Sequence, residues 1–563
     1  MVPGSIPGKG KKTSGEKGGG PSDLPIGSPQ GGQQTSEEFY SNIPVELNMS
    51  EVLVDANVKR GLGSKTAIYF GDETYDYRWL QESSNQVANG LTFLGLEIEN
   101  RYMILLHDCP EFVCAFLGGM RIGAIPVCVN TMLDMNTIQF MIEDSRAKVL
   151  ITTTEHYEKI KPFRNQLRHL RHIILVNTKG VEPAGIDLRS DVHVWSKLMA
   201  TAKKTFLVEK TYKNDIGLWL YSSGSTGRPK AAVHMQHDIL ATTDLYAKQI
   251  LGIGEDSICF SASKLFFAYG LGNSLTFPLR WGGATVLYPD KPTPDGIFNL
   301  LERFKPTHFF GVPTLFAAML ASPGAKDHDL SFLRCIVSAG ESLQPAIFQQ
   351  WKETYGQEIL DGIGSTEMLH IFISNRPGEV MPGSSGKLVP GYEARIVDDD
   401  WKDVPDGNIG NLLVKGESMA VLYWGRHKKS SKVMLGDWIM TGDLYSRDKD
   451  GYYYYAGRSD DMLKVGGIWV SPVEVENAIA ELPEVLESAV VGNPDESDLI
   501  KPKAYVVLKQ GNEATDALMD KIKEHVKKRT SKYKYPRWVE FVQELPKTAT
   551  GKIQRFKLRK DKN

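Results

Sequence analysis

The chain has little cysteine and no long apolar run. Five cysteines occur in 563 residues, and no two of them form a CxxC pair. Few, scattered cysteines of odd number in a large chain argue for reduced thiols in a cytosolic setting. No apolar run approaches the roughly 20 residues that span a bilayer, and the start, MVPGSIPGKGKK, lacks the apolar segment of a signal peptide. These absences predict a soluble, cytoplasmic protein that does not enter the membrane.

An excess of charge of one sign is also missing. The 66 Lys and Arg residues nearly balance the 68 Asp and Glu residues, which leaves a net charge of −2. This balance gives no general attraction to nucleic acid or to an anionic membrane, so neither is expected as a partner. Hydrophobic residues make up 41% of the chain and charged residues 24%, as in ordinary globular proteins. The length exceeds what one hydrophobic core holds, so two or more domains are expected.

The composition changes at both ends of the chain. Residues 1–35 hold ten glycines and no hydrophobic periodicity, which predicts a disordered leader over residues 1–37, either native or added. The polar stretch GRSDDMLK predicts a hinge and a domain boundary near residue 458. The roughly 100 residues after it are enough for a small separate domain.

Short apolar runs alternate with helical stretches over residues 38–458. Strand-like runs include RYMILL, AKVLITT, HIILV and RCIVSAG, and helix candidates include LQESSNQVANGLTFLG and TIQFMIEDSR. Strands that alternate with helices indicate parallel sheets covered by helices, an α/β architecture. The tail contains KAYVVLK, DALMDKIKEHVKKR and WVEFVQELP. The predicted fold is a large N-terminal α/β domain over 38–458 and a small C-terminal α+β domain over 459–563.

The run YSSGSTGRPK, residues 221–230, is the first candidate site. It follows the apolar run IGLWL and offers N–H and hydroxyl donors and two cations, with no carboxylate. Such a loop suits a phosphate chain. Its spacing differs from GxxxxGK[ST], so it is not a Walker A loop. The loop alone supports a phosphate site and a plain polar loop equally.

Four further motifs each pair a chemical candidate with an ordinary alternative. DGIGSTEMLH contains Thr366 and Glu367; the carboxylate suits Mg²⁺, which prefers few protein oxygens plus phosphate, or is a solvated loop side chain. In TGDLY, Asp443 can accept hydrogen bonds from a ribose diol or merely cap a turn. GRSDD contains Arg458, which is either part of a site or an ordinary surface charge. PKTATGKIQR contains Lys552, which is either part of a site or an ordinary solvated lysine. Each motif is weak by itself.

In this order and at these separations, the five motifs resemble those of the acyl-adenylate-forming enzymes, which include acyl-CoA synthetases, luciferases and peptide-synthetase adenylation domains. The resemblance covers about residues 40–560. Longer runs of the chain are similar to those of benzoate–CoA ligases and related aryl-CoA ligases. These runs are KLFFAYGLGNSLTFPL, HFFGVPTLFAAML, VSAGESL and YYYAGRSDDMLKVGGIWVSP. The resemblance implies the adenylate-forming enzyme fold and an enzyme that uses ATP, Mg²⁺ and coenzyme A. A small aromatic carboxylate would form acyl-AMP and pyrophosphate, and then aryl-CoA and AMP.

The resemblance also implies roles for particular residues. The β- and γ-phosphates of ATP would be held by Ser222, Ser223, Gly224, Ser225, Thr226, Gly227 and Lys230. Thr366 would touch the α-phosphate, Glu367 would bind Mg²⁺, and Lys552 would bridge the reacting carboxylate and the α-phosphate. The nucleoside would be held by Asp443 and Arg458 at the ribose and by Gly340, Glu341, Ser342 and Asp361 at the adenine. An ammonium suits the place of Lys552, because it stabilises charge that shifts between neighbouring oxygens.

The acyl pocket and the second half-reaction use further positions. The resemblance implies a pocket made of Phe267, Ala268, Tyr269, Gly270, Gly311, Ala339, Gly364, His370 and Ile371. Aromatic and small residues suit a flat ring, and FFAYGLGN could also be plain core, although the family match favours the pocket. His370 can line the pocket or satisfy a buried carbonyl. For thioester formation the small domain would rotate about a hinge at Asp460 and bring in a coenzyme A segment with Lys464, Gly466 and Gly467.

Some departures from the family pattern and some alternatives stay open. Ala231 stands where the family usually has Gly after the loop lysine, and Gly466 and Trp469 stand where relatives often have Ser and Tyr. One alternative is an adenylating enzyme for another cyclic or a hydroxy- or amino-substituted carboxylate. Transfer to a carrier protein and a non-catalytic nucleotide-binding protein are others. The motifs do not identify the preferred ring acid, and the resemblance implies a monomer or homodimer.

Overall fold

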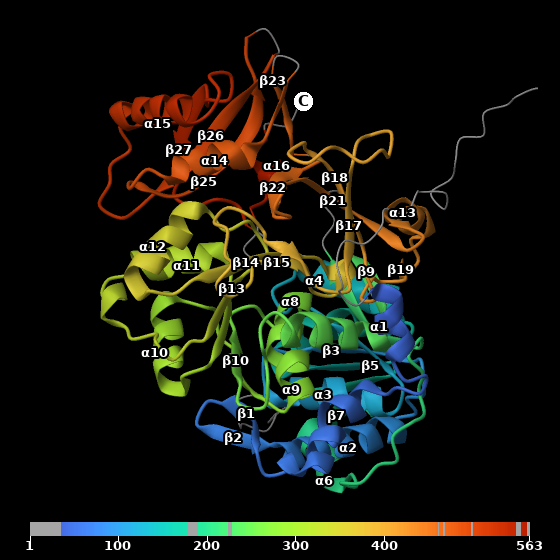
Figure 1. The fold of residues 1–563 in the computed structure, drawn as a ribbon. Helices are drawn as coiled ribbons and strands as arrows, with labels where there is room; N and C mark the ends of the chain where they lie inside the picture. Colours follow the sequence, from blue (N-terminus) through green and yellow to red (C-terminus); the bar gives the residue numbers. More distant parts are fainter. Residues whose placement is uncertain are drawn as a thin grey trace, which may run out of the picture.

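The computed structural model describes residues 35–177, 190–222, 228–459, 461–465, 468–496, 499–547 and 553–559 (Figure 1). Helix α1 (Ser36–Asn42) already includes two residues that the composition assigns to the leader, because Thr35 and Glu38 form a capping box. Within these ranges, every helix is too short or too polar to span a bilayer. All five cysteines are buried and unpaired.

Two large sheets form most of the N-terminal domain, and parallel strands occupy their centres. In the described residues, the first sheet has the order β19 (Leu422–Tyr423), β9 (Lys230–Met235), β8 (Ile216–Ser222), β4 (Ile125–Cys128), β3 (Arg101–Leu105), β5 (Val149–Thr153), β6 (His172–Val176), β7 (Val192–Val194). The second has the order β16 (Lys387–Leu388), β15 (Ile371–Ser374), β14 (Ile359–Gly364), β13 (Cys335–Ser338), β12 (His308–Gly311), β10 (Ile258–Ser261), β11 (Ala284–Leu287), β1 (Thr66–Phe70), β2 (Glu73–Asp76).

Strand β3 illustrates why these strands read as continuous apolar runs. Tyr102 and Ile104 face a core that also contains residues of the second sheet, whereas Met103 and Leu105 face another core on the opposite side. A strand that is covered on both faces has no polar side, so its sequence shows no alternation. The α/β prediction for this domain is therefore correct.

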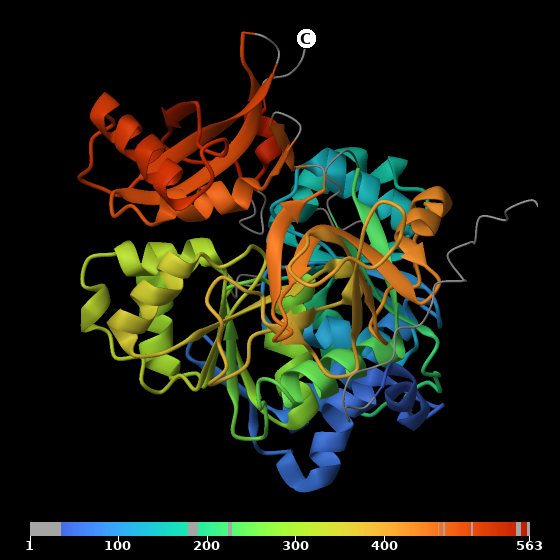
Figure 2. The ribbon, with the colours of Figure 1, turned by 45° about the horizontal axis from the view of Figure 1, so that its top comes forward.

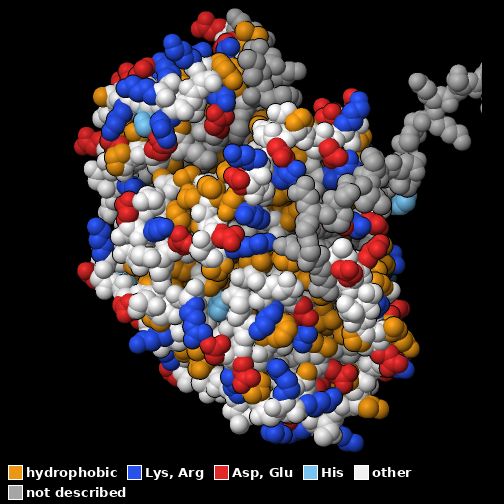
Figure 3. Space-filling view, viewed as in Figure 1, with side chains coloured by type: hydrophobic (Ala, Val, Ile, Leu, Met, Phe, Trp, Pro, Cys, Tyr) orange, Lys and Arg blue, Asp and Glu red, His pale blue; other side chains and the backbone are white. Residues whose placement is uncertain are grey.

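Helices cover the outer faces of the sheets and fill the layer between them (Figures 1 and 2). The helices of the N-terminal domain after α1 are α2 (Tyr77–Phe93), α3 (Pro110–Arg121), α4 (Met135–Ser145), α5 (Thr154–Ile160), α6 (Trp195–Thr201), α7 (Gln236–Leu240), α8 (Ala268–Leu271), α9 (Phe277–Trp281), α10 (Pro294–Phe304), α11 (Pro313–Ala321), α12 (Pro345–Tyr355) and α13 (His427–Val433). Helices α2 and α3 pack between the two sheets. On the face in Figure 3, side chains of both charges are interspersed.

A third sheet differs from the expected alternation of strands and helices. It is antiparallel and contains β17 (Glu393–Val397), β18 (Gly410–Lys415), β20 (Met434–Leu435), β21 (Trp438–Arg447) and β22 (Tyr453–Arg458). Turns join β20 to β21 and β21 to β22, whereas β19 and α13 lie between β18 and β20. The turn between β21 and β22 uses Asp448, which accepts backbone hydrogen bonds, and Gly451, whose φ is +84°. This turn chemistry joins antiparallel strands directly.

The C-terminal residues form a small α+β lobe, red in Figures 1 and 2. Strands β23 (Leu463–Val465) and β24 (Ile468–Val470) pair with each other, and β25 (Val485–Pro494), β26 (Ile500–Leu508) and β27 (Trp538–Phe541) form a second sheet. The helices are α14 (Pro472–Ala480), α15 (Asp516–Arg529) and α16 (Arg555–Leu558). This lobe has its own core, in which α14 and α15 pack on β25 and β26.

Candidate functional site

The topology brings several predicted site residues to one edge of the second sheet. Strands β12, β13 and β14 are parallel neighbours, so their carboxyl ends meet at the same edge, where open α/β sheets bind ligands. Gly311 ends β12, Gly340 follows β13, and Gly364 ends β14. Thr366 and Glu367 come next, in the 3₁₀ turn η8 (Thr366–Met368).

The two described ends of the predicted phosphate loop lie on paired strands. Ser222 ends β8, Lys230 begins β9, and the two residues are directly opposite each other in the antiparallel ladder. Ser223, Gly224, Ser225, Thr226 and Gly227 lie outside the described residues. Ala231 is buried, pairs with Tyr221 and has a negative φ, so Ala in place of Gly fits this strand without strain.

Three donors converge on one oxygen of Glu367. Its Oε1 accepts from Lys230 Nζ at 2.9 Å, from Ser222 Oγ at 3.1 Å and from the Tyr423 hydroxyl at 2.7 Å. Burial raises the pKa of this carboxyl, but the Lys230 ammonium and the hydrogen bonds from Lys230 and Tyr423 outweigh burial and lower the pKa to about 2. Glu367 is therefore ionised at neutral pH.

The backbone of the turn that carries Glu367 is held at three successive carbonyl oxygens. The Thr366 carbonyl accepts from His234 Nε2 at 2.8 Å, the Glu367 carbonyl from the Ala420 N–H at 2.7 Å, and the Met368 carbonyl from Ser418 Oγ at 2.7 Å. The next residue, Leu369, has a φ of +61°. Such strain persists only where neighbouring groups over-determine the conformation, as they do here.

The two residues predicted to hold the ribose form an ion pair. Asp443 on β21 and Arg458 on β22 are opposite each other, and Arg458 Nη1 lies 2.9 Å from Asp443 Oδ1. The Asp443 N–H donates to Thr441 Oγ1 at 3.1 Å, next to a left-handed Gly442 with a φ of +76°. The turn and the strand pairing together orient the Asp443 carboxylate.

The residues predicted to frame the adenine follow β13 or lie on β14. Gly340, Glu341 and Ser342 follow β13 after Ala339, and the φ of +97° at Gly340 favours glycine there. Asp361 on β14 is buried, which raises its pKa well above the usual range, and its Oδ1 has no hydrogen-bond partner among the described residues.

Glu341 also contacts the C-terminal lobe. Its Oε1 accepts from the backbone N–H of Ile553 at 2.7 Å. Ile553 is the first described residue after Lys552. The chain that follows Lys552 therefore reaches the predicted adenine site.

The predicted acyl residues Tyr269 and His370 contact each other. His370 Nε2 donates to the Tyr269 carbonyl at 3.3 Å and to Asn273 Oδ1 at 3.1 Å. The Tyr269 hydroxyl donates to the carbonyls of Gly311 and Val337, each at 3.3 Å. Burial lowers the pKa of His370 to about 3, so the ring is neutral, and its buried Nδ1 has no partner among the described residues.

Close backbone packing explains three glycines of the predicted acyl set. A Cβ on Gly270 would lie 2.1 Å from the Lys264 carbonyl oxygen, one on Gly364 would lie 2.5 Å from the His370 carbonyl oxygen, and one on Gly311 would meet the Phe316 ring at 2.7 Å. The other members lie on the same elements or beside them: Phe267 caps α8, Ala268 begins it, Ala339 follows β13, and Ile371 begins β15. The structure thus groups the residues that the resemblance assigns to the acyl group.

Several predicted positions are not described. Lys552, Asp460, Gly466 and Gly467 lie outside the described residues. The backbone of Lys464 belongs to β23 and pairs with Trp469.

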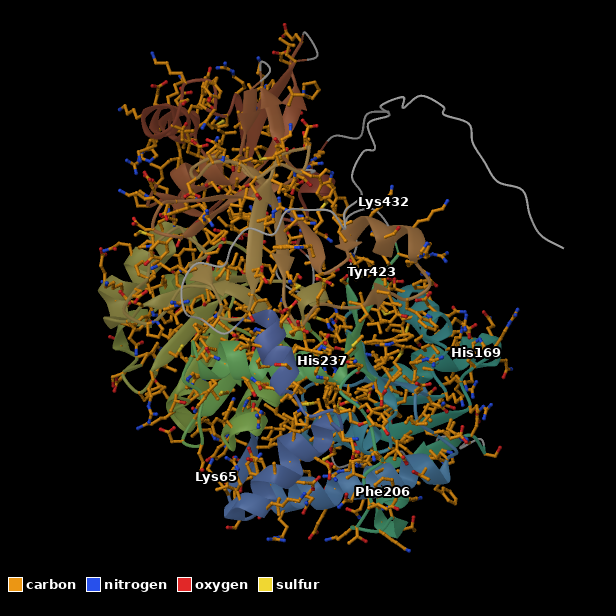
Figure 4. All side chains as sticks on the ribbon, turned by 45° about the vertical axis from the view of Figure 1, so that its right-hand side comes forward. Lys65, His169, Phe206, His237, Tyr423 and Lys432 are labelled. Carbon is orange, nitrogen blue, oxygen red and sulfur yellow. The ribbon has the colours of Figure 1, made fainter. Side chains whose placement is uncertain are left out.

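Three further residues at the site escape the motif analysis. Tyr423 bonds both Lys230 and Glu367, and it lies near α13, the helix that carries Lys432 (Figure 4). His234 holds the turn through its Nε2, and its Nδ1 lies 2.7 Å from Asp238 Oδ2. The i, i+4 spacing of His234 and Asp238 is the one sequence feature that relates these two residues. No sequence feature marks Tyr423 as part of the site. No group of three or more His, Cys, Asp and Glu suited to a metal gathers within the described ranges.

The chain matches the family profile of the AMP-binding enzyme over residues 54–424 and that of the AMP-binding enzyme C-terminal domain over residues 474–552. It is 45% identical to a benzoate–CoA ligase of Thauera aromatica over 92% of this chain and 96% of the relative.

Solved structures agree with these sequence matches. An anthranilate CoA ligase in complex with anthranoyl-AMP has a TM-score of 0.87 and 43% identity, covering 92% of this chain and 98% of that one. A benzoate CoA ligase from Burkholderia xenovorans LB400 has a TM-score of 0.83 and 41% identity, covering 91% of this chain and all of that one.

Proposed function

The chain belongs to the AMP-binding enzyme family, as a member of its benzoate–CoA ligase group, and from this premise we propose that it joins benzoate or a closely related aryl carboxylate to coenzyme A. In the first step a carboxylate oxygen attacks the α-phosphorus of ATP, the bond to the bridging oxygen of the β-phosphate breaks, and pyrophosphate leaves. In the second step the thiol sulfur attacks the acyl carbon, AMP leaves with the former carboxylate oxygen, and the thiol proton is released. The protein is thus an AMP-forming acid–thiol ligase.

The observation that carries the proposal is the contact between Lys230 and Glu367. These residues are 137 positions apart in sequence, and a Nζ–Oε1 distance of 2.9 Å joins them at the end of the predicted phosphate loop. The first step brings two anions together, so positioning and charge neutralisation are its main requirements. At this place the Lys230 ammonium can donate hydrogen bonds to phosphate oxygens, and the ionised Glu367 carboxylate can bind a metal ion.

The residues at Glu367 fit a magnesium ion. The carboxylate is ionised, it is a hard oxygen ligand, and the three side chains that donate to it all bind Oε1. Mg²⁺ is usually held by one or two carboxylates plus substrate phosphates. When bound, the ion would neutralise phosphate charge, while Lys230 and Ser222 of this chain would donate to the phosphate oxygens.

The remaining nucleotide contacts come from both domains. Asp443 accepts well from a ribose diol, because Arg458 and the Thr441 turn fix its orientation. The Oδ1 of Asp361, which has no hydrogen-bond partner among the described residues, is available to a donor such as the adenine amino group. Lys552 would bridge the reacting carboxylate and the α-phosphate, and the contact between Ile553 and Glu341 supports delivery of that segment to the nucleotide. A rotation about Asp460 would then replace Lys552 with Lys464, Gly466 and Gly467 for the thioester step.

The acyl group would lie against Tyr269, His370 and the glycines at the strand ends. Because His370 is neutral and donates through Nε2 to two acceptors, it adds no charge to a pocket for an uncharged ring. A single ring substituent in an apolar pocket changes binding by only about 1–3 kcal/mol. Benzoate and its amino- and hydroxy-derivatives are therefore the substrates to compare. We expect a cytoplasmic monomer or homodimer.

A pyrophosphate-release assay tests the proposal. With ATP, Mg²⁺ and benzoate, the enzyme should release pyrophosphate once and hold benzoyl-AMP. Addition of coenzyme A should then allow repeated turnover, with benzoyl-CoA as the product. Benzoate-dependent pyrophosphate release that coenzyme A does not accelerate would favour another acyl acceptor, such as a carrier protein. The absence of any acid-dependent release across a panel of aryl carboxylates would refute the proposal.

A further inference from the structure

Tyr423 links the phosphate loop to the turn that carries Glu367. It lies on β19, where it pairs with Ala232 of β9, and only 2% of its surface is exposed. Its N–H donates to Ser430 Oγ at 2.9 Å, which fixes its backbone. Its hydroxyl accepts from Lys230 Nζ at 2.6 Å and donates to Glu367 Oε1 at 2.7 Å, and Lys230 Nζ lies 3.9 Å from the centre of its ring. The phenol therefore contacts both members of the ion pair.

The hydrogen bonds to Glu367 divide its carboxylate into two halves. Ser222, Lys230 and Tyr423 all donate to Oε1. Within the described part of the chain, no side chain donates to Oε2. One oxygen is thus anchored to the protein, and the other is left for a ligand.

Two of the three donors have another task in the proposed reaction. Lys230 and Ser222 belong to the phosphate loop, and each would turn its donor toward ATP. Tyr423 lies outside the loop and is held in place by β9 and Ser430. Once the Lys230 ammonium donates to the phosphates instead of Glu367, Tyr423 is the donor that still holds Oε1.

We propose that Tyr423 is a positioning residue that keeps the carboxylate of Glu367 in its metal-binding orientation while Lys230 binds the phosphates of ATP. The inference rests on the proposed function, since it takes Glu367 as the magnesium ligand. It concerns the side chain alone, because His234, Ala420 and Ser418 hold the backbone of the turn independently. Loss of the phenol hydroxyl therefore releases the carboxylate and leaves the turn intact.

The variant Tyr423→Phe isolates the hydroxyl, because it retains every carbon atom and the ring face against Lys230. Mn²⁺ is titrated into enzyme and ATP without an acid substrate, and bound metal is measured by electron paramagnetic resonance. Partners that orient a metal ligand typically contribute about 10- to 100-fold in metal affinity, and we expect a loss in that range. Tyr355→Phe is the matched control, because that hydroxyl donates to the Ala325 carbonyl, away from the site.

Steady-state kinetics separate positioning from a general structural effect. In Tyr423→Phe, the Mg²⁺ concentration for half-maximal adenylation should rise by the same factor, and saturating Mg²⁺ should restore kcat to within about threefold of wild type. In a Glu367→Gln background, the same change should have no further effect on Mn²⁺ binding.

The outcomes distinguish the inference from the function on which it rests. Wild-type Mn²⁺ affinity in Tyr423→Phe, or a kcat that saturating Mg²⁺ fails to restore, overturns the inference and leaves the ligase function standing if wild-type enzyme makes benzoyl-CoA. A wild-type enzyme that neither binds Mn²⁺ with ATP nor forms aryl-CoA overturns both.

Discussion

Removal of the Lys230 ammonium should destabilise the N-terminal domain, and removal of Glu367 as well should restore much of the loss. The substitution Lys230→Met replaces the ammonium-bearing chain with an uncharged one that is one atom shorter, and leaves the Glu367 carboxylate charged at a place where both side chains are only 14% exposed. A charge that loses its partner in such a place is strongly destabilising, whereas removal of both charges is often nearly neutral.

The magnitude follows from the acidity of Glu367. Its pKa falls from the ordinary value of 4.5 to about 2 although burial alone would raise it. Each pKa unit corresponds to about 1.36 kcal/mol, so burial and the partners together leave a net preference of about 3.4 kcal/mol for the ionised form, and the Lys230 ammonium is the largest favourable cause. Unfolding entropy is about 2.1 cal/mol/K per residue, so a domain of roughly 400 residues should lose about 4 °C in apparent Tm.

Scanning calorimetry without nucleotide at pH 7 measures this effect in wild type, Lys230→Met, Glu367→Gln and the double variant. The single lysine variant should melt about 4 °C below wild type, and the double variant clearly above the single one. A double variant whose loss equals the sum of the two single losses would refute the reasoning, since independent sites add and coupled sites do not.

Three further predictions address the two half-reactions and the acyl site. Lys552→Ala should lower benzoyl-AMP formation by about 10²–10³-fold yet still convert added benzoyl-AMP to the thioester; an undiminished adenylation rate in a pyrophosphate-exchange assay would show that this role is wrong. Asp460→Pro should slow thioester formation more than adenylation, and equal losses in separate single-turnover assays would argue against a hinge there. Burial lowers the pKa of His370 from its ordinary value of 6.5 to about 3. Below pH 6.5 this histidine binds a proton in the unfolded chain but not in the folded one. The contribution to the free energy of unfolding that is present above pH 6.5 is therefore lost as the pH falls. The apparent Tm of wild type should therefore drop more between pH 7 and pH 5 than that of His370→Phe, and equal drops would contradict this.

The sequence predicts the parallel sheets well and the antiparallel one poorly. Strands such as β3 and helices such as α15 stand out, because burial on both faces or helical periodicity appears within a short window. The antiparallel sheet of β17, β18, β20, β21 and β22 depends on turns such as the one at Asp448 and Gly451, and strands such as β21 and β22 have irregular burial patterns. Local apolar runs therefore do not distinguish it from the alternating part of the domain.

The candidate site was predictable where a motif carries the chemistry. Ser222, Lys230 and Glu367 are each in a motif, and the fold brings them together. Tyr423 and His234 are different, because their importance comes from contacts with residues 56 and 132 positions away. A short sequence window does not predict such contacts, because they arise from the way β9 and β19 pack beside the turn.

Isotope transfer from the acid to AMP tests the central claim most directly. The enzyme is given ATP, Mg²⁺, coenzyme A and benzoate labelled with ¹⁸O in both carboxylate oxygens, and AMP is analysed by mass spectrometry. Attack of the carboxylate on the α-phosphorus followed by thiol displacement predicts one ¹⁸O in each AMP and one in each benzoyl-CoA. Unlabelled AMP, or ADP with labelled phosphate, would contradict an acyl-adenylate intermediate.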